Sequence, residues 1–256
     1  DAFNAILSNS ADRKATINFN NVNITEDNAF PVINENCELT LTGSYTNVSY
    51  AFDFEGDGPF IIHSSANIVT GNNLFGNYRR VEFEQNGGTV TVGDQWVANF
   101  DSQGKYVLKN GTVNGAIGGY GDFVMDSGTL NGYINGPKSI TINGGNINTT
   151  SGPGFYVYSV YLQEGSELHI NGGSISATGL VSGRQEGPAI AIVAEKNATI
   201  ALKNEVDITA KSANNKPSAS IWYYDSEDQK VIDATEVTGF TNPLTIAARS
   251  DAMKNI

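Results

Sequence analysis

The stretch KSITINGGNINTT, residues 138–150, contains the pattern that decides the fold. Ile140 and Ile142 are two residues apart, so both side chains point to the same side of a strand. A short polar turn with glycine follows, and Ile147 points to that side again five positions after Ile142. One such unit cannot bury its own apolar face, whereas a stack of units can, because each unit covers its neighbour.

The same unit recurs along the chain. GDFVMDSGTLNG at 121–132 and SELHINGGSISAT at 166–178 have the same spacing, and three further segments fit with small changes in the turn: residues 79–92, 105–115 and 198–209. This repeat predicts an all-β fold, a single-stranded right-handed parallel β-helix. A left-handed helix is disfavoured because its strict hexapeptide repeat is absent.

The number of residues between the second apolar positions of successive units gives the length of a coil. The first coils are expected to be 21 residues long, the middle ones 17, and the last two steps 28 and 32. A gapless shift of 32 also aligns residues 156–170 with residues 188–202, so the last coils share strands as well as loops. The positions used are Leu41, Ile62, Phe83, Leu108, Met125, Ile142, Ile170 and Leu202.

One corner of the coil carries a column of glycines, as expected where every coil repeats the same special backbone angle. Asn143 and Asn171 occupy the column two residues earlier, where stacked amides can bond from coil to coil. Glu84, Lys109 and Asp126 continue that column, which predicts opposite charges beside each other. The glycines are Gly111, Gly128, Gly145 and Gly173.

The ends of the chain depart from the repeat. Residues 1–14 read as a short amphipathic helix, with Asp1 as N-cap, that caps the first coil. Residues 15–215 are assigned to the coils, and residues 216–256 to the last coil or coils and a C-terminal cap or tail. The missing initiator methionine suggests a removed signal peptide, and the tail suggests a following domain.

Composition narrows the class of function. The net charge is −12, which repels nucleic acids and anionic membrane surfaces. Asn, Ser and Thr supply the polar surface, the chain has 28 glycines, and no apolar run is long enough to span a membrane. A single cysteine, Cys37, allows no internal disulfide, and its place among alternating apolar residues predicts a buried structural thiol.

The opening of the chain resembles a known family. A short N-terminal helix followed by ATINFNNVNIT (15–25) and FPVINENCELTLTG (30–43) looks like the start of the pectate-lyase-like adhesive domains of Gram-positive surface proteins. The NGGxI coils also look like those of β-helical carbohydrate-binding modules from secreted bacterial proteins. The resemblance implies a domain that binds rather than cleaves, outside the cell.

No catalytic residue, metal ligand or cofactor is predicted. Asp53, Glu55 and Asp57 echo half of a calcium loop, but Ser64 stands where a closing carboxylate belongs, so a solvated turn is favoured. Asp225, Glu227 and Asp228 also read as a solvated turn. The two histidines are expected at the surface: His63 at a turn and His169 between inward-pointing neighbours.

Aromatic residues in the long coils indicate a candidate binding face. The shift of 32 sets Tyr158 opposite Ile190, facing inward, so Tyr161 faces outward near the loop with Arg184 and Glu186. Exposed aromatics beside polar groups suit sugars, because a ring packs on a pyranose while polar groups bind hydroxyls.

The segment IWYY adds to this face in one of two ways. Either Trp222 and Tyr224 or Ile221 and Tyr223 point outward, and the alignment does not choose between them. The predicted ligand-binding residues are Tyr161, Arg184, Glu186, Trp222 and Tyr224. Scattered exposed aromatics without a ligand are the alternative interpretation.

The expected function is that of a non-enzymatic binding or adhesin module that recognises glycans. The chain is expected to be a monomeric part of a longer surface or secreted bacterial protein, without nucleic-acid partners or membrane insertion. A polysaccharide lyase or glycoside hydrolase and a purely structural stalk are the alternatives, since this architecture supports all three.

Overall fold

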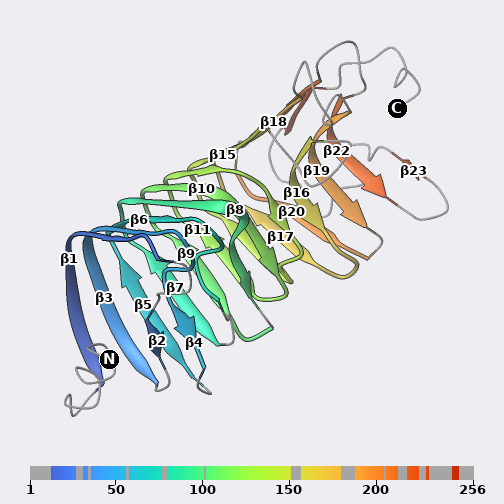
Figure 1. Ribbon diagram of the computed structural model, residues 1–256. Coiled ribbons are helices and arrows are strands. Elements are labelled where there is room, and N and C mark those ends of the chain that lie inside the picture. Colours follow the sequence, from blue (N-terminus) through green and yellow to red (C-terminus); the bar gives the residue numbers. More distant parts are fainter. Residues whose placement is uncertain are drawn as a thin grey trace. The chain divides into compact units, whose positions relative to one another are not determined.

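The structure is a computed structural model of residues 1–256 (Figure 1). The described residues are 13–26, 31–33, 36–55, 58–76, 80–100, 102–150, 157–179, 188–195, 197–204, 206–212, 218–224, 229–230 and 244–247. All regular elements among them are strands, as the repeat predicts. Two compact units divide the chain, Asp1–Val124 and Met125–Ile256.

Unit 1 is built from parallel strands that pair coil on coil. One ladder runs β1–β3–β5–β7–β9, and a second runs β3–β6–β8–β10, so the long β3 belongs to both. A two-stranded pair, β2–β4, lies apart from them. The strands are β1 (Lys14–Ile24), β2 (Val32–Ile33), β3 (Cys37–Asn47), β4 (Asp53–Phe54), β5 (Phe60–Ser64), β6 (Asn67–Thr70), β7 (Val81–Gln85), β8 (Thr89–Phe100), β9 (Lys105–Leu108) and β10 (Thr112–Gly119), with β11 (Asp122–Met125) at the boundary.

The described strands of unit 2 form three parallel ladders, one for each side of a coil: β12–β15–β18–β21–β24, β13–β16–β19–β22 and β14–β17–β20. Each strand pairs with the strand three later in the chain, as in a parallel β-helix. Among the described strands of this unit, β23 alone pairs antiparallel, with β22. The strands are β12 (Thr129–Asn131), β13 (Ile134–Asn135), β14 (Ser139–Ile142), β15 (Asn146–Thr149), β16 (Val157–Leu162), β17 (Glu167–Ile170), β18 (Ser174–Thr178), β19 (Ala189–Glu195), β20 (Thr199–Leu202), β21 (Val206–Lys211), β22 (Ser218–Tyr224), β23 (Gln229–Lys230) and β24 (Leu244–Ala247).

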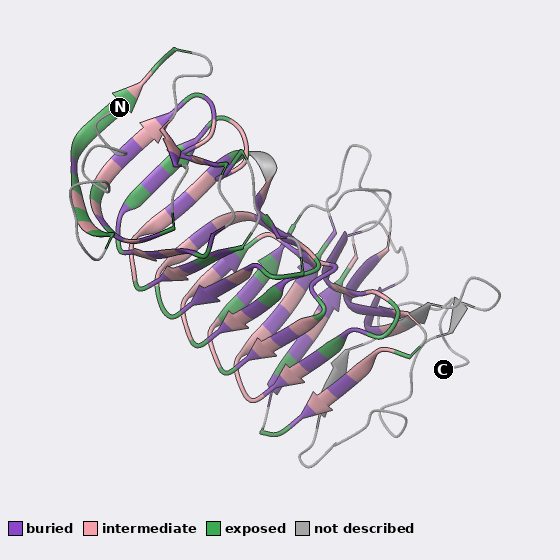
Figure 2. Ribbon diagram, turned by 90° about the horizontal axis from the view of Figure 1, so that it is seen from below, coloured by how far each residue is buried: buried purple, intermediate pink, exposed green. Residues whose placement is uncertain are grey.

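Buried residues, coloured purple in Figure 2, alternate with more exposed ones along many strands and form the core of each unit. In unit 1 much of the core is aromatic: the ring centroids of Phe75 and Phe83 are 5.6 Å apart, and those of Phe83 and Tyr106 are 5.1 Å apart. In unit 2 the inward positions of β14, β17 and β20 are aliphatic. Ring pairs at these distances add to the free energy gained by burial.

The register confirms most of the predicted coil lengths. Ile142 lies opposite Ile170, and Ile170 lies opposite Leu202, which gives the predicted steps of 28 and 32. Ile62 lies opposite Phe83, which confirms one step of 21. The predicted steps from Leu41 to Ile62 and from Phe83 to Leu108 were each wrong by two residues. The reason is that buried polar side chains occupy inward positions in these strands.

Ser64 and Gln85 are these inward polar residues, both fully buried. Ser64 lies opposite Leu41, and Gln85 lies opposite Leu108, so the apolar partners assumed from the sequence are displaced along the strand. Gln85 is satisfied internally: its Oε1 accepts a hydrogen bond of 2.6 Å from Tyr106 Oη, and its Nε2 donates to two backbone carbonyls. A satisfied amide can stay in an apolar core without a large cost.

The predicted corner is confirmed. All four glycines of the column have positive φ, and a Cβ on Gly173 would lie 2.5 Å from the carbonyl oxygen of Gly145. In unit 2 the predicted ladder also forms: Asn143 Nδ2 donates to Asp126 Oδ1 at 2.7 Å, and Asn171 Nδ2 donates to Asn143 Oδ1 at 2.7 Å. The predicted helical cap cannot be compared with the fold, because residues 1–12 lie outside the described residues, and Lys14 already begins β1.

Ile142→Asp should destabilise unit 2 by more than about 4 kcal/mol, because it buries an unpaired charge at a position with no exposed surface. Urea unfolding followed by circular dichroism measures the loss. Thr141→Asp, on the other face of the same strand, is the control and should cost less than about 1 kcal/mol. Equal losses in the two variants would contradict the register of β14.

Gly173→Ala should cost more than Gly165→Ala, although both positions have positive φ. At Gly165 nothing lies within 4 Å of an added Cβ, so only backbone strain of about 1 kcal/mol is expected. At Gly173 the clash with the preceding coil adds to that strain, for a total of at least about 2 kcal/mol. Unfolding free energies of the two variants decide the point, and equal costs would mean that the coils are not in close contact at this corner.

Candidate binding surface

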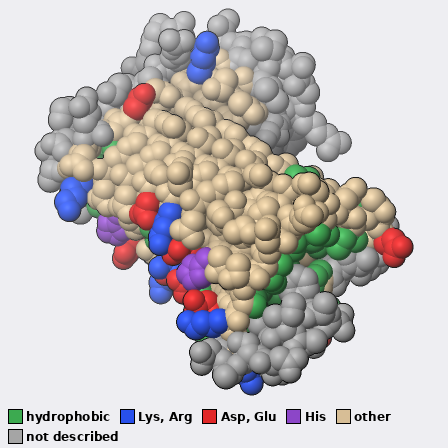
Figure 3. Space-filling view, turned by 90° about the vertical axis from the view of Figure 1, so that its left-hand side faces the viewer, with side chains coloured by type: hydrophobic (Ala, Val, Ile, Leu, Met, Phe, Trp, Pro, Cys, Tyr) green, Lys and Arg blue, Asp and Glu red, His purple; other side chains and the backbone are tan. Residues whose placement is uncertain are grey.

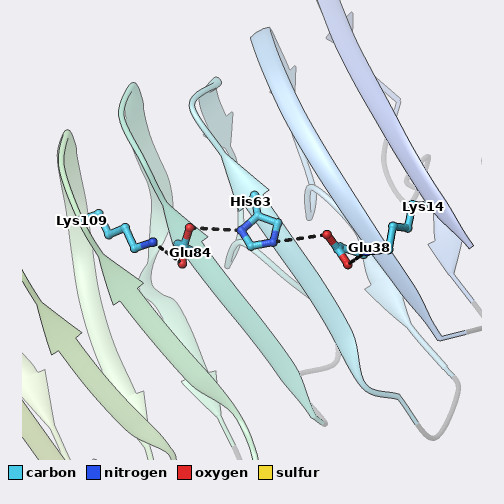
Figure 4. A network of polar contacts seen from close by, with 5 residues as sticks. All are labelled: Lys14, Glu38, His63, Glu84 and Lys109. Atoms are coloured by element: carbon cyan, nitrogen blue, oxygen red, sulfur yellow. Dashed lines mark hydrogen bonds and ion pairs between the residues drawn. The ribbon is translucent and has the colours of Figure 1, made fainter. Parts of the chain in front are cut away.

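Charged side chains gather in a row on one outward face of unit 1 (Figures 3 and 4). Lys14 Nζ lies 2.6 Å from Glu38 Oε2, and Lys109 Nζ lies 2.8 Å from Glu84 Oε2. His63 stands between the two carboxylates, with Nε2 3.8 Å from Glu38 and Nδ1 3.2 Å from Glu84. The row therefore alternates between basic and acidic residue types from strand to strand, from β1 to the residue after β9.

This row corrects two sequence interpretations. His63 was expected at a turn, but it lies half-buried within β5, where a strand neighbour on each side supplies a carboxylate. Glu84 and Lys109 were expected in one column, and they do form an ion pair, although Glu84 lies opposite Val107 in the register. The long lysine side chain bridges the difference of two residues.

The ion pairs perturb both glutamates. Partial burial alone would raise the pKa of Glu84, but hydrogen bonds from Lys109, Asn86 and His63 outweigh it and hold the pKa below its usual value of 4.5. The pKa of Glu38 is also lowered, mainly by the hydrogen bond from Lys14. Both carboxylates therefore stay charged at neutral pH and stabilise the row in that form.

A second outward face carries short neutral side chains instead. In unit 1 the register sets Thr46, Val69, Thr91 and Asn114 in one column across β3, β6, β8 and β10. Asn114 Nδ2 donates to Thr91 Oγ1 at 2.9 Å. In unit 2 the matching strands bond in the same way, since Ser174 Oγ donates to Asn146 Oδ1 at 2.8 Å and Ser176 Oγ donates to Asn148 Oδ1 at 3.1 Å. These contacts tie neighbouring coils together.

The predicted aromatic face lies on β16, β19 and β22 of unit 2. Tyr158 is buried and lies opposite Ile190, as predicted, while Tyr161 is half-buried and faces outward. Tyr161 lies opposite Val193, which in turn lies opposite Trp222. Strand spacing places the Cα atoms of Tyr161 and Trp222 about 10 Å apart on one outward column.

The sequence left open which residues of IWYY (221–224) point outward, and the structure describes the side chains of the first two. Ile221 is buried, whereas Trp222 is half-buried. Alternation along a strand then assigns Trp222 to the outward face. Tyr224 lies opposite Glu195 in the backbone register, and its side chain is outside the described part of the chain, as are Arg184 and Glu186.

Glu195 is the residue of this face that the sequence interpretation missed. Its Oε1 accepts a hydrogen bond of 2.5 Å from Tyr161 Oη, and its Oε2 accepts one of 3.0 Å from the backbone N–H of Glu164. Asn197 Nδ2 donates to Glu164 Oε1 at 3.2 Å. The shift of 32 residues could have revealed it, because that shift sets Glu195 only two residues from Tyr161 along the neighbouring strand.

We call Tyr161, Trp222, Glu195 and Glu164 the aromatic–acidic patch. Its parts suit hydroxyl-rich ligands: a ring offers an apolar face, and a carboxylate accepts hydrogen bonds from hydroxyl groups. Tyr161 also packs against the buried Tyr158, with ring centroids 5.4 Å apart, so a neighbouring ring supports it. A supported ring loses less conformational freedom when a ligand binds.

The remaining candidates are the histidine of β17, the cysteine and the acidic turns. Among the described residues, no group of three or more His, Cys, Asp and Glu could hold a metal ion. His169 lies 3.5 Å from Glu167 on the surface of β17. Cys37 is buried, as expected, and burial raises the pKa of its thiol to about 12. Asp57, Asp225, Glu227 and Asp228 lie outside the described residues.

Within the described ranges, no helix is long and apolar enough to cross a membrane. No protein-family model, no curated protein and no solved structure matches this chain. The geometry of the molecule itself is therefore the basis for its proposed function.

Glu84→Gln should lower the melting temperature at pH 7 by about 2 °C, because it removes one partly exposed ion pair. A carboxyl with a lowered folded-state pKa stabilises the fold above its unfolded pKa, and this contribution is lost as pH falls through the folded value. The difference between variant and wild type should therefore shrink below about pH 4.5. Thermal melts from pH 7 to pH 3 measure it, with Glu82→Gln on the same strand as control. A difference independent of pH would contradict the assignment.

Proposed function

We propose that this chain is a non-catalytic glycan-binding module of the adhesin type, from a secreted or surface protein of bacteria. The resemblance of its first coils to pectate-lyase-like adhesive domains supports this proposal, and so does its parallel coil architecture. We also propose that the coils are right-handed and that residues 1–14 form a helical cap. The aromatic–acidic patch is the proposed ligand site, together with Arg184, Glu186 and Tyr224, which the sequence predicts beside it.

One observation carries the proposal: Tyr161 and Trp222 stand half-exposed on one outward column, with the Glu195 carboxylate hydrogen-bonded to Tyr161 at 2.5 Å. Large aromatic side chains usually go into the core of a solenoid, as Tyr106 does. Two of them kept partly in solvent beside an acceptor group fit a site that stacks on sugar rings and binds their hydroxyls.

A structural stalk is the second candidate, and the neutral face favours it. The hydrogen-bonded Ser, Thr and Asn columns join coil to coil without offering charge to a partner. Such columns would stiffen a spacer between other domains. They also suit a binding module, which needs a rigid scaffold, so the ligand test below separates the two.

Tyr161→Ala combined with Trp222→Ala should abolish binding on a glycan array, because both rings of the patch are removed. Wild-type affinities are expected in the range of about 1 μM to 1 mM, since stacking and a few hydroxyl contacts rarely supply more. Tyr120→Ala is the control, because Tyr120 is 64% exposed and belongs to unit 1, whereas the patch belongs to unit 2.

Three outcomes would count against the proposal. An array without any hits for wild type favours the stalk. Hits that survive the double substitution place the ligand elsewhere on the chain. Shortening of polygalacturonate during incubation makes the protein an enzyme. Melting curves accompany each variant, so that a loss of binding is not confused with a loss of fold.

A further inference from the structure

Asn–Gly pairs recur along this chain, and each is a place where a protein can modify itself. The backbone nitrogen of the glycine can attack the amide carbon of the preceding asparagine, because glycine has no Cβ to hinder the approach. Since all the pairs share the same two residues, the fold decides which of them reacts first. The pairs begin at Asn86, Asn110, Asn114, Asn131, Asn135, Asn143 and Asn171.

Asn110 differs from the other asparagines in its hydrogen bonding. It lies exposed at the corner after β9, and the N–H of Gly111 donates to its Oδ1 at 2.8 Å. This bond brings the attacking nitrogen beside Cγ, the carbon that carries Oδ1. Within the described part of the chain, no contact ties Nδ2 of Asn110 to another residue, so this nitrogen can leave as ammonia.

In five of the other pairs, a hydrogen bond holds the side-chain nitrogen that would have to leave. This bond must break before the amide can turn towards the glycine, so it slows the reaction. The bonds run from Asn143 to Asp126 and from Asn171 to Asn143 at 2.7 Å, from Asn114 to Thr91 and from Asn135 to Tyr158 at 2.9 Å, and from Asn86 to Glu84.

In the remaining pair, which begins at Asn131, the attacking nitrogen is held instead. The N–H of Gly132 donates to the backbone carbonyl of Asn148 on the neighbouring coil at 3.1 Å. The N–H of Gly136 likewise donates to a carbonyl of the next coil at 3.3 Å, so the pair at Asn135 is held at both nitrogens. The N–H of Gly111, by contrast, bonds within its own turn.

We infer that Asn110 is a site of spontaneous deamidation and that it reacts before the other six pairs. The nitrogen of Gly111 forms a bond to Cγ of Asn110 and loses its proton to solvent, while the Cγ–Nδ2 bond breaks and ammonia leaves. Water then opens the cyclic imide at either of its two carbonyl carbons, which gives aspartate or isoaspartate. The reaction needs water alone, and the inference is independent of the proposed glycan-binding function.

The product changes this corner of unit 1 in two ways. A carboxylate appears next to Lys109, whose ammonium group pairs with Glu84. In the isoaspartate form the main chain also gains a carbon atom beside Gly111, where an added Cβ would already lie 2.5 Å from the carbonyl oxygen of Gly88. The site therefore couples the age of the protein to the packing of this corner.

Peptide mapping by mass spectrometry can follow all seven pairs in one sample of the whole chain, incubated at mildly alkaline pH. In the folded protein, Asn110 should convert at least about five-fold faster than any other pair, the factor that one retained hydrogen bond contributes to a rate. A sample unfolded in urea is the matched control. These hydrogen bonds are absent there, so the lead of Asn110 should disappear.

Two variants test the cause of the selectivity. Asp126→Ala removes, at an exposed position, the acceptor that holds Nδ2 of Asn143. It should raise the rate at Asn143 by at least about three-fold and leave the rate at Asn110 unchanged. Asn110→Gln should eliminate the fastest reaction without transferring it to another pair. Melting curves check that both variants keep the fold.

Several results would overturn the inference. One is a folded protein in which another pair reacts first or all seven react alike. Another is a folded Asn110 that stays intact while the urea sample reacts at every pair, because the fold then protects it. An unchanged rate at Asn143 in Asp126→Ala also overturns it, since side-chain hydrogen bonds then do not set the order. None of these results alters the glycan-array test, so the two proposals stand or fall separately.

Discussion

The structure depends on one constraint: every coil must close over the inward side chains of the coil before it. Parallel pairing sets successive coils about 4.8 Å apart, so residues in one column touch whether or not they are near in sequence. Ile142, Ile170 and Leu202 form such a column although 28 and 32 residues separate them. Core, corner glycines and surface ladders all follow from this single geometric requirement.

The two units meet this requirement with different side chains. Unit 1 fills its coils with phenylalanine and tyrosine and tolerates a buried glutamine, because Tyr106 and two carbonyls satisfy its amide. The inward positions of β14, β17 and β20 in unit 2 are aliphatic, and aromatic residues appear at the outward side of its longer coils. An aromatic residue on the outside of a coil is therefore unusual in this protein, because most aromatic residues of unit 1 pack in the interior.

Much of the fold could be predicted from the sequence, because apolar spacing and glycine position report backbone geometry directly. Gly145, Gly173, Asn143 and Asn171 occupy the places that their column required. The register around Gln85 could not be predicted, because a polar residue in an inward position breaks the apolar pattern from which the register was predicted. Hydrogen bonding inside the core, which decides such a case, leaves no periodic signal in the sequence.

The candidate site was predictable only in part for a related reason. Tyr161 and Trp222 were recognisable as large outward residues once the shift of 32 was known. Glu195 was missed because its hydrogen bond joins it to Tyr161, 34 residues earlier in the chain. Such a bond can be predicted only when the register between the two neighbouring strands is known exactly. Errors of two residues, such as the one around Leu41, are enough to hide a contact of this kind.

The shortest coil step has a consequence for how such a chain can change in length. Thr129 and Asn146 lie opposite each other and are 17 residues apart, with Asp126 and Asn143 bonded across the same step. Because a coil contacts only its two neighbours, the duplication or loss of one such segment keeps every column in register. A gene that encodes this architecture can thus lengthen or shorten its product by whole coils without redesigning a core.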